Sequence, residues 1–128
     1  MIAAIAAIGR NWQLGLHGRL PWPQDSADMD WFIQHTKERV LLCGPKTFES
    51  IAHLDGSHDR MVINIATDDR WMGLDDAMIV GGASTYRHFA PHIEQLYLSQ
   101  IDYDGPADCL FPVEAFRPDQ LRNVIWRK

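Results

Sequence analysis

The chain has 128 residues and a formal net charge of −5; 46% of its residues are hydrophobic and 23% are charged. These values are ordinary for a soluble globular protein, and the length fits one domain, residues 1–128, around a single core. The negative net charge argues against a nucleic-acid partner, because nucleic-acid-binding proteins usually present a stripe of basic residues. The apolar run 1–8 is too short to span a membrane and lacks signal-peptide features. Cys43 and Cys109 form no CxxC pair, so we expect two free thiols in a reducing cytoplasm.

Apolar and capping patterns predict strands alternating with helices. Residues 1–8 are apolar at every position, as in a central strand covered on both faces. A helix is predicted over 25–36, with Asp25 or Ser26 as its N-cap. The remaining pattern predicts helices over 44–51 and 83–90, and strands over 39–43, 61–65, 77–80, 96–101 and 121–127. This order indicates an α/β domain with a mostly parallel sheet, which binds ligands beyond the carboxyl ends of its strands.

Two of these strand exits run through glycine into a predicted helix. They are CGPKTF, residues 43–48, and VGGASTY, residues 80–86. Free backbone N–H groups at a helix start favour an anion, and glycine lets a ligand approach the backbone closely. Neither stretch is a P-loop or a GxGxxG motif, so each alone is also compatible with a plain helix start or tight turn. Two such exits on one sheet could together hold the two phosphates of a dinucleotide.

An acidic side chain on an apolar helix face forms another candidate site. Asp28 shares a face of the helix DSADMDWF with Trp31 and Phe32, three and four residues further on. Partial desolvation there would raise the pKa of Asp28 and make it a proton donor or an anchor for a polar ring. In the alternative interpretation, Asp25, Asp28 and Asp30 are all solvated acids at a helix start.

Two further features bear on the site. His88 and His92 have the spacing of a helical metal pair, but Pro91 ends the helix between them, so we expect no metal site. The segment GLHGRLPW, residues 15–22, holds more apolar side chains than a connector needs, which raises the question of what they cover.

These pieces, in this order, resemble the dihydrofolate reductase family. The resemblance covers residues 1 to about 112 and is carried by MIAAIAAI, GLHGRLPW, Asp28 with Trp31 and Phe32, GPKTFESI, MIVGGASTY, LYLSQID and DCLFP. It implies a three-layer fold with helices on both faces of a mostly parallel sheet. It also implies reduction of 7,8-dihydrofolate by NADPH, a step of one-carbon metabolism that supports thymidylate synthesis. Hydride would pass from nicotinamide C4 to pterin C6, and water would protonate N5.

The resemblance gives individual residues their expected roles. Asp28 would accept two hydrogen bonds from the aminopyrimidine edge of the pterin, Trp22 would hold a water beside it, and Leu20 would cover the nicotinamide from a mobile lid formed by 15–20. The expected substrate-binding residues are Ile5, Ala6, Asp28, Phe32, Ile51, Leu54, Arg60, Val80 and Ser99. The expected cofactor-binding residues are Ala7, Leu14, Gly15, Gly44, Lys46, Thr47, Gly81, Gly82, Ala83, Ser84, Thr85 and Tyr86. In the family a cis peptide bond joins the two adjacent glycines.

The chain also departs from the family pattern. The connection 66–76 is short, so we expect its usual helix to be absent or one turn long. We expect the final antiparallel strand of the family to be missing, which would leave one edge of the sheet exposed. The protein would then be a monomer, or a weak homodimer that forms through this edge.

Basic residues differ as well. Pro45 replaces a usual arginine, and the tail-binding arginine is displaced, so Arg60 is our candidate for the glutamate carboxylate of folate, with His58 second. The 2′-phosphate of NADPH would rely on Lys46, Thr67, Arg70 or Ser84. We therefore expect a weak preference for NADPH, with NADH tolerated.

Two alternative functions stay open at this level. One is a binding protein that kept the fold and lost turnover. The other is a pterin or flavin-precursor reductase of similar fold. Asp28 with Trp31 and Phe32 favours dihydrofolate and antifolates as ligands, because that acid would contact the aminopyrimidine edge.

Overall fold

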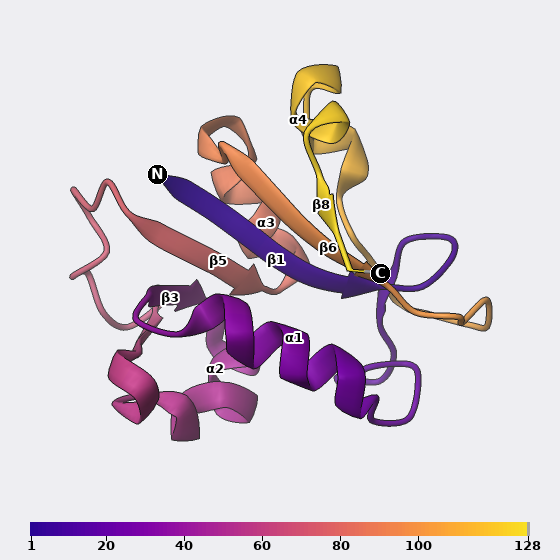
Figure 1. Ribbon diagram of the computed structural model, residues 1–128, viewed down its shortest axis with the longest axis horizontal. Coiled ribbons are helices and arrows are strands. Elements are labelled where there is room, and N and C mark those ends of the chain that lie inside the picture. The colour runs from indigo at the N-terminus through magenta and orange to yellow at the C-terminus, as the bar shows by residue number, and fades with distance from the viewer. Residues whose placement is uncertain (128) are drawn as a thin grey trace.

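The computed structural model describes residues 1–127, and a six-stranded sheet forms its centre. Figure 1 shows the arrangement of this sheet and its helices. All five strand pairings in this sheet are parallel. In sheet order the strands are β4 (Met61–Asn64), β3 (Val40–Cys43), β5 (Ala77–Gly81), β1 (Ile2–Ile8), β6 (Gln95–Gln100) and β8 (Ile125–Trp126). The mostly parallel sheet predicted from the sequence is thereby confirmed.

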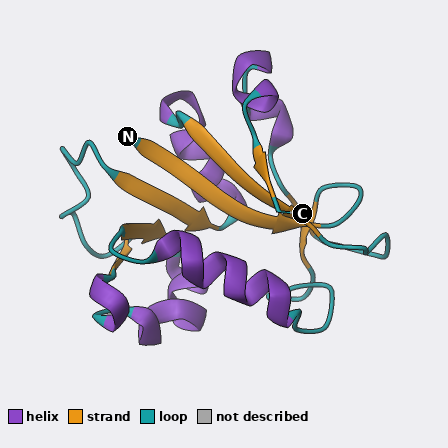
Figure 2. Cartoon of the chain, in the orientation of Figure 1, coloured by secondary structure: helices purple, strands orange, loops and turns teal. Residues whose placement is uncertain are grey.

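Helices cover both faces of the sheet, as the three-layer prediction requires (Figures 1 and 2). One face carries α1 (Ser26–Thr36) and α2 (Pro45–Ile51), and the other carries α3 (Ala83–Phe89) and α4 (Pro118–Arg122). A separate antiparallel pair joins β2 (Gln13–Gly15) to β7 (Cys109–Leu110). Short 3-10 turns are η1 (Ala52–Leu54), η2 (Ser57–Asp59), η3 (Ala90–His92) and η4 (Val113–Ala115). Within residues 1–127 we find no helix with the length and apolar character needed to cross a bilayer.

Local sequence signals explain where the helices of the site begin. The Asp25 side chain accepts a hydrogen bond from the backbone N–H of Asp28 at 3.0 Å, which caps α1. Helix α2 starts with Pro45, whose missing N–H is not needed in the first turn. Both helices therefore begin within a residue of the predicted positions.

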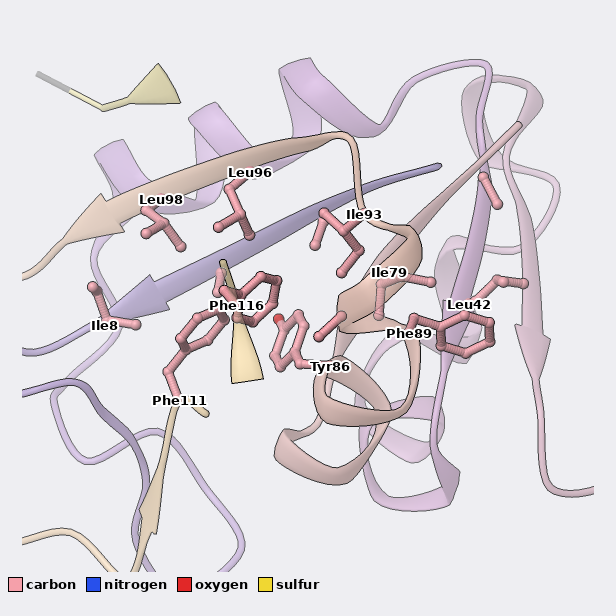
Figure 3. Packing of buried hydrophobic residues seen from close by; sticks show 14 of the residues in the cluster. Ile8, Leu42, Ile79, Tyr86, Phe89, Ile93, Leu96, Leu98, Phe111 and Phe116 are labelled. Atoms are coloured by element: carbon pink, nitrogen blue, oxygen red, sulfur yellow. The ribbon is translucent and has the colours of Figure 1, made fainter. Parts of the chain in front are cut away.

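The face under α3 is closed by large aromatic side chains (Figure 3). Phe111 is 1% exposed and stacks between Trp12, at a centroid distance of 5.8 Å, and Phe116, at 5.3 Å. Tyr86 is also buried and its hydroxyl donates to the carbonyl of Ile5 at 2.6 Å. This hydrogen bond satisfies the one polar atom of the Tyr86 side chain, so the ring can be buried without leaving its hydroxyl unpaired.

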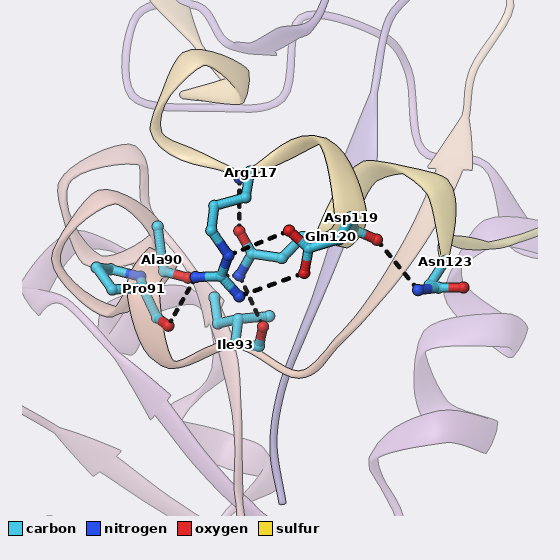
Figure 4. A network of polar contacts seen from close by, with 7 residues as sticks. All are labelled: Ala90, Pro91, Ile93, Arg117, Asp119, Gln120 and Asn123. Carbon is cyan, nitrogen blue, oxygen red and sulfur yellow. Dashed lines mark hydrogen bonds and ion pairs between the residues drawn. The ribbon is translucent and has the colours of Figure 1, made fainter.

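The strand predicted over 121–127 is only partly correct. Leu121 lies in helix α4, and only Ile125 and Trp126 pair with β6. The helix is fixed by Gln120, whose buried side-chain amide donates to the carbonyls of Ala90 at 2.7 Å and Ile93 at 2.8 Å (Figure 4). The Gln120 side-chain oxygen also accepts from the Arg117 backbone at 2.7 Å. An apolar pattern does not reveal such polar docking, which is why the sequence alone pointed to a strand.

Three smaller expectations are met. Residues 66–76 form turns and no helix. Strand β8 is an edge of the sheet, and its residues Ile125 and Trp126 are 43% and 42% exposed. Both cysteines are free, and burial raises the pKa of the Cys43 thiol to about 11.

Candidate active site

Asp28 lies in the first turn of α1 and faces the buried Ser99 on β6. Its side chain is 15% exposed, and this burial raises the pKa of the Asp28 carboxyl above its ordinary value. A hydrogen bond with Ser99 and the positive charge of Arg127 oppose that rise, while the nearby charge of Asp25 adds to it. The raised pKa predicted from the apolar helix face is therefore confirmed, and the alternative of three fully solvated acids does not hold for Asp28.

Arg127 lies beside this carboxylate, and sequence reasoning did not place it there. Its Nε donates to Ser99 Oγ at 2.5 Å and lies 3.9 Å from Asp28 Oδ1. Its Nη2 lies 3.9 Å from Asp25 Oδ2. The arginine reaches this position because β8 pairs with β6, a two-residue contact that leaves almost no periodic signal in the sequence.

The same face of the sheet carries a cluster of apolar side chains. Ile5 and Val80 rise from the sheet on this face and are 2% and 9% exposed. The residues of α1, α2 and η1 that pack against them are only partly buried: Trp31, Phe32, Phe48, Ile51 and Leu54. The structure thus brings most of the predicted substrate-binding residues together. Ala6 is different, because its side chain packs in the opposite core with Tyr86, so it offers this face only its backbone.

A close glycine junction joins the carboxyl ends of β3 and β5. Gly81 and Gly82 are linked by the expected cis peptide bond, and the Gly44 N–H donates to the Gly81 carbonyl at 2.9 Å. A Cβ on Gly81 would lie 3.0 Å from Thr47 Oγ1, and one on Gly44 would lie 3.1 Å from Thr85 Oγ1. The starts of α2 and α3 can lie side by side only because these positions have no side chain.

The other predicted cofactor-binding residues differ in exposure. Lys46 and Ser84 are exposed, and Ala83 is half-buried. Thr85 and Tyr86 are buried, at 3% and 2% exposure, so their side chains belong to the packing beneath the junction.

The segment 15–20 forms a tight hairpin turn. Leu16 and Arg19 exchange backbone hydrogen bonds of 2.7 and 3.1 Å across His17 and Gly18, which both have positive φ angles. Asp108 holds this turn, because its side chain accepts from the His17 N–H at 2.9 Å. Gly15 sits in β2 and Leu14 is half-buried there, whereas Leu20 is 50% exposed.

Trp22 follows this turn and is 7% exposed. Its ring lies 5.7 Å from that of Tyr103, centroid to centroid. The Trp22 Nε1–H is buried and has no hydrogen-bond partner among residues 1–127. A buried, unpaired indole donor fits a residue that binds a water or ligand atom.

Two arginines named from the sequence already have partners. Arg60 is 3% exposed and donates to Thr36 Oγ1 at 3.0 Å, to the Ile33 carbonyl at 2.8 Å and to the Ser57 carbonyl at 3.1 Å. A fourth contact runs to His58 Nδ1 at 3.4 Å. Arg70 is exposed and forms a forked ion pair with Asp68, at 2.6 to 3.1 Å.

The parallel sheet, with a desolvated carboxylate and a glycine junction beyond its strand ends, is typical of α/β enzymes that bind nucleotides. Comparison with known proteins is more specific. A family model described as dihydrofolate reductase matches residues 1–124. The chain therefore belongs to the dihydrofolate reductase family, a family of oxidoreductases, and the resemblance seen in the sequence is confirmed.

Individual relatives agree with this assignment. A dihydrofolate reductase of Buchnera aphidicola is 28% identical, over 87% of this chain and 78% of that protein. A dihydromethanopterin reductase of Methylorubrum extorquens is 31% identical, over 86% of this chain and 89% of that protein. Among solved structures, a dihydrofolate reductase from Enterococcus faecalis complexed with NADP(H) and RAB-propyl superposes with a TM-score of 0.64. It is 22% identical and covers 88% of this chain and 77% of its own, which supports the shared fold.

Proposed function

We propose that this chain reduces 7,8-dihydrofolate to 5,6,7,8-tetrahydrofolate with NADPH. The observation that carries the proposal is Asp28. Its carboxylate is largely desolvated and faces Ser99, and the half-buried Trp31 and Phe32 follow it on the same helix, in a member of the dihydrofolate reductase family. Such a group suits the planar, hydrogen-bonding edge of a pterin ring.

On the substrate side, the ionised Asp28 accepts two hydrogen bonds from the aminopyrimidine edge. Phe32, Ile51 and Leu54 then pack on the pterin and aminobenzoyl rings, above Ile5 of the sheet. Burying apolar surface contributes about 25 cal/mol per Å² of area removed from water, so these half-exposed side chains favour a flat apolar ligand. The same contacts would hold antifolates that present a similar edge.

On the cofactor side, the residues present fit a dinucleotide. Glycines at 44, 81 and 82 let the starts of α2 and α3 lie close together, and Lys46, Thr47 and Ser84 lie beside them. When bound, the reduced nicotinamide supplies the hydride that pterin C6 accepts. Ala7, Leu14 and Gly15 are the residues we expect beside the nicotinamide, with Leu20 closing over it from the hairpin turn.

Protonation of pterin N5 needs a second group, and water is our candidate carrier. The unpaired Trp22 Nε1–H can orient such a water. Asp28 holds the ring in place and stabilises it electrostatically, while closure of the 15–20 segment excludes bulk water from the hydride path.

A second substrate, dihydromethanopterin, is favoured by two observations. The dihydromethanopterin reductase named above is 31% identical, and this chain covers 89% of it. In addition, the four contacts of Arg60 use four of its five N–H groups, leaving one among the described residues for a folate glutamate. Both substrates contain a dihydropterin ring.

The test follows the loss of NADPH absorbance after adding either dihydrofolate or dihydromethanopterin. A kcat/KM for dihydrofolate at least as high as that for dihydromethanopterin supports the proposal. Preference for dihydromethanopterin by tenfold or more supports the second substrate. Binding of either compound without turnover would contradict both and support a binding protein that kept the fold.

A further inference from the structure

A buried row of polar groups runs from the edge of the sheet to the candidate substrate site. Arg127 Nε donates to Ser99 Oγ at 2.5 Å, and the same nitrogen lies 3.9 Å from Asp28 Oδ1. Ser99 is fully buried, and the side chains of Arg127 and Asp28 are only 19% and 15% exposed. Charges at this separation interact strongly where solvent screening is weak.

Backbone pairing fixes the arginine at this position. The Arg127 N–H donates to the Leu98 carbonyl at 2.9 Å, directly beside Ser99. The preceding residue, Trp126, pairs with Leu98 in the β6–β8 ladder. The sheet therefore holds the Arg127 backbone beside β6, and the Arg127 side chain lies next to Ser99 of β6 and Asp28 of α1.

The charges facing Asp28 are unbalanced without this arginine. Asp25, on the turn before α1, adds a second negative charge, and Arg127 Nη2 lies 3.9 Å from Asp25 Oδ2. Burial and Asp25 both raise the pKa of Asp28, whereas Ser99 and Arg127 lower it. One guanidinium thus faces two carboxylates, and a protonated Asp28 would lose one of the two acceptor positions that an aminopyrimidine edge requires.

We propose that Arg127 is a positioning residue for the Asp28 carboxylate: it orients Ser99 and stabilises the negative charge of Asp28 while staying out of contact with the substrate. The role of Asp28 in substrate binding rests on the function proposed above. The arrangement of Arg127, Ser99 and Asp28 is independent of it. Arg127 therefore acts on substrate affinity and on its pH dependence, and much less on the hydride step.

The experiment compares Arg127→Gln with Arg127→Lys and with a matched control, Arg122→Gln. Arg122 is an exposed arginine on α4, five residues away in the sequence. The titration of the Asp28 carboxyl carbon is followed by NMR in each protein. We expect the Asp28 pKa to rise by about one unit in Arg127→Gln, as removal of an opposite charge at this distance implies. Arg127→Lys should restore part of the difference, and Arg122→Gln should match the wild type.

Kinetics supply the second readout. In Arg127→Gln the acid limb of kcat/KM should move to higher pH by the same amount, with KM for the dihydropterin raised severalfold and kcat nearly unchanged. An Asp28 that titrates alike in the wild type and Arg127→Gln would overturn the proposal, as would a loss confined to kcat.

Two further outcomes are distinguishable. If the wild type reduces no dihydropterin, the proposed function fails while the NMR titration still decides the role of Arg127. If Arg127→Gln does not fold, the Arg127 Nε–H resonance of the wild type is followed across the same pH range. That resonance should move with the titration of Asp28, and a constant resonance would overturn the proposal.

Discussion

The two faces of the central sheet are covered to different degrees. On one face, α3 buries Thr85, Tyr86 and Phe89, and Phe111 and Phe116 close the layer behind it. On the other face, α1 buries only Thr36 and α2 buries no residue completely. The same strand supplies both faces, since alternate residues of β1 point to opposite sides.

The difference separates what holds the fold from what serves the ligand. On the α3 face the protein's own side chains fill the layer, and the burial of their apolar surface stabilises the domain. The α1 face carries the partly desolvated Asp28 among side chains that remain half-exposed. We infer that bound pterin and nicotinamide complete this second layer, so substitutions on the two faces should have different consequences.

The largest expected contrast is between two phenylalanines. Phe111→Ala should lower the free energy of unfolding by about 3–5 kcal/mol, because it leaves a cavity among fully buried rings. Phe32→Ala should cost only about 1 kcal/mol, since that side chain is half-buried, but should raise KM for the dihydropterin about tenfold. Chemical denaturation and steady-state kinetics measure both. Equal losses of unfolding free energy in the two variants would contradict the expected difference between the two faces.

Asp28→Asn should remove activity without removing stability. We expect kcat/KM at neutral pH to fall about 100-fold, because a neutral amide cannot accept both hydrogen bonds of the aminopyrimidine edge. The pKa of Asp28 is higher in the folded state than in the unfolded state. At neutral pH the ionised carboxylate therefore destabilises the folded protein. A neutral asparagine removes this cost, so the Tm of the variant should be no lower than that of the wild type. Asp30→Asn, an exposed acid on the same helix, is the control and should behave as the wild type.

The pH dependence of kcat/KM gives a second test of the role of Asp28. In the wild type, kcat/KM should fall as the pH drops through the Asp28 pKa, at a midpoint above the ordinary carboxyl value of 3.8. In Asp28→Asn this acid limb should be absent. An unchanged acid limb in the variant would mean that another group controls binding.

Cofactor preference should be weak and adjustable. Arg70 is paired with Asp68, so we expect kcat/KM with NADPH to exceed that with NADH by less than about tenfold. Asp68→Asn should free Arg70 and raise the ratio a fewfold, whereas Asp69→Asn should leave it unchanged. Strong discrimination by the wild type would show that another residue holds the 2′-phosphate.

The smallest expected effect concerns the exposed edge of β8. Ile125 and Trp126 are 43% and 42% exposed there, and an open strand edge favours pairing with a second copy. We expect weak, concentration-dependent association in sedimentation velocity, and Ile125→Lys should abolish it. A mass that stays monomeric at every concentration would show that no dimer covers this edge.

Much of this arrangement could be predicted from sequence, and the failures share one cause. Buried strands such as 1–8 and capped helices such as 26–36 depend on local apolar and capping patterns, which are legible in a single chain. The raised pKa of Asp28 followed from its neighbours on one helix. Helix α4 and Arg127, in contrast, depend on polar contacts with residues about thirty positions away, such as Gln120 with Ala90 and Arg127 with Ser99. The hydrophobic periodicity of a sequence gives no sign of such polar contacts between distant residues.

The most direct test of the difference between the faces is hydrogen exchange measured by mass spectrometry, with and without a folate-type ligand. If the ligand completes the α1 face, exchange should slow in residues 26–36 and 45–54 and stay unchanged in α4 and η3. Equal protection of both faces, or protection confined to α4 and η3, would contradict the account.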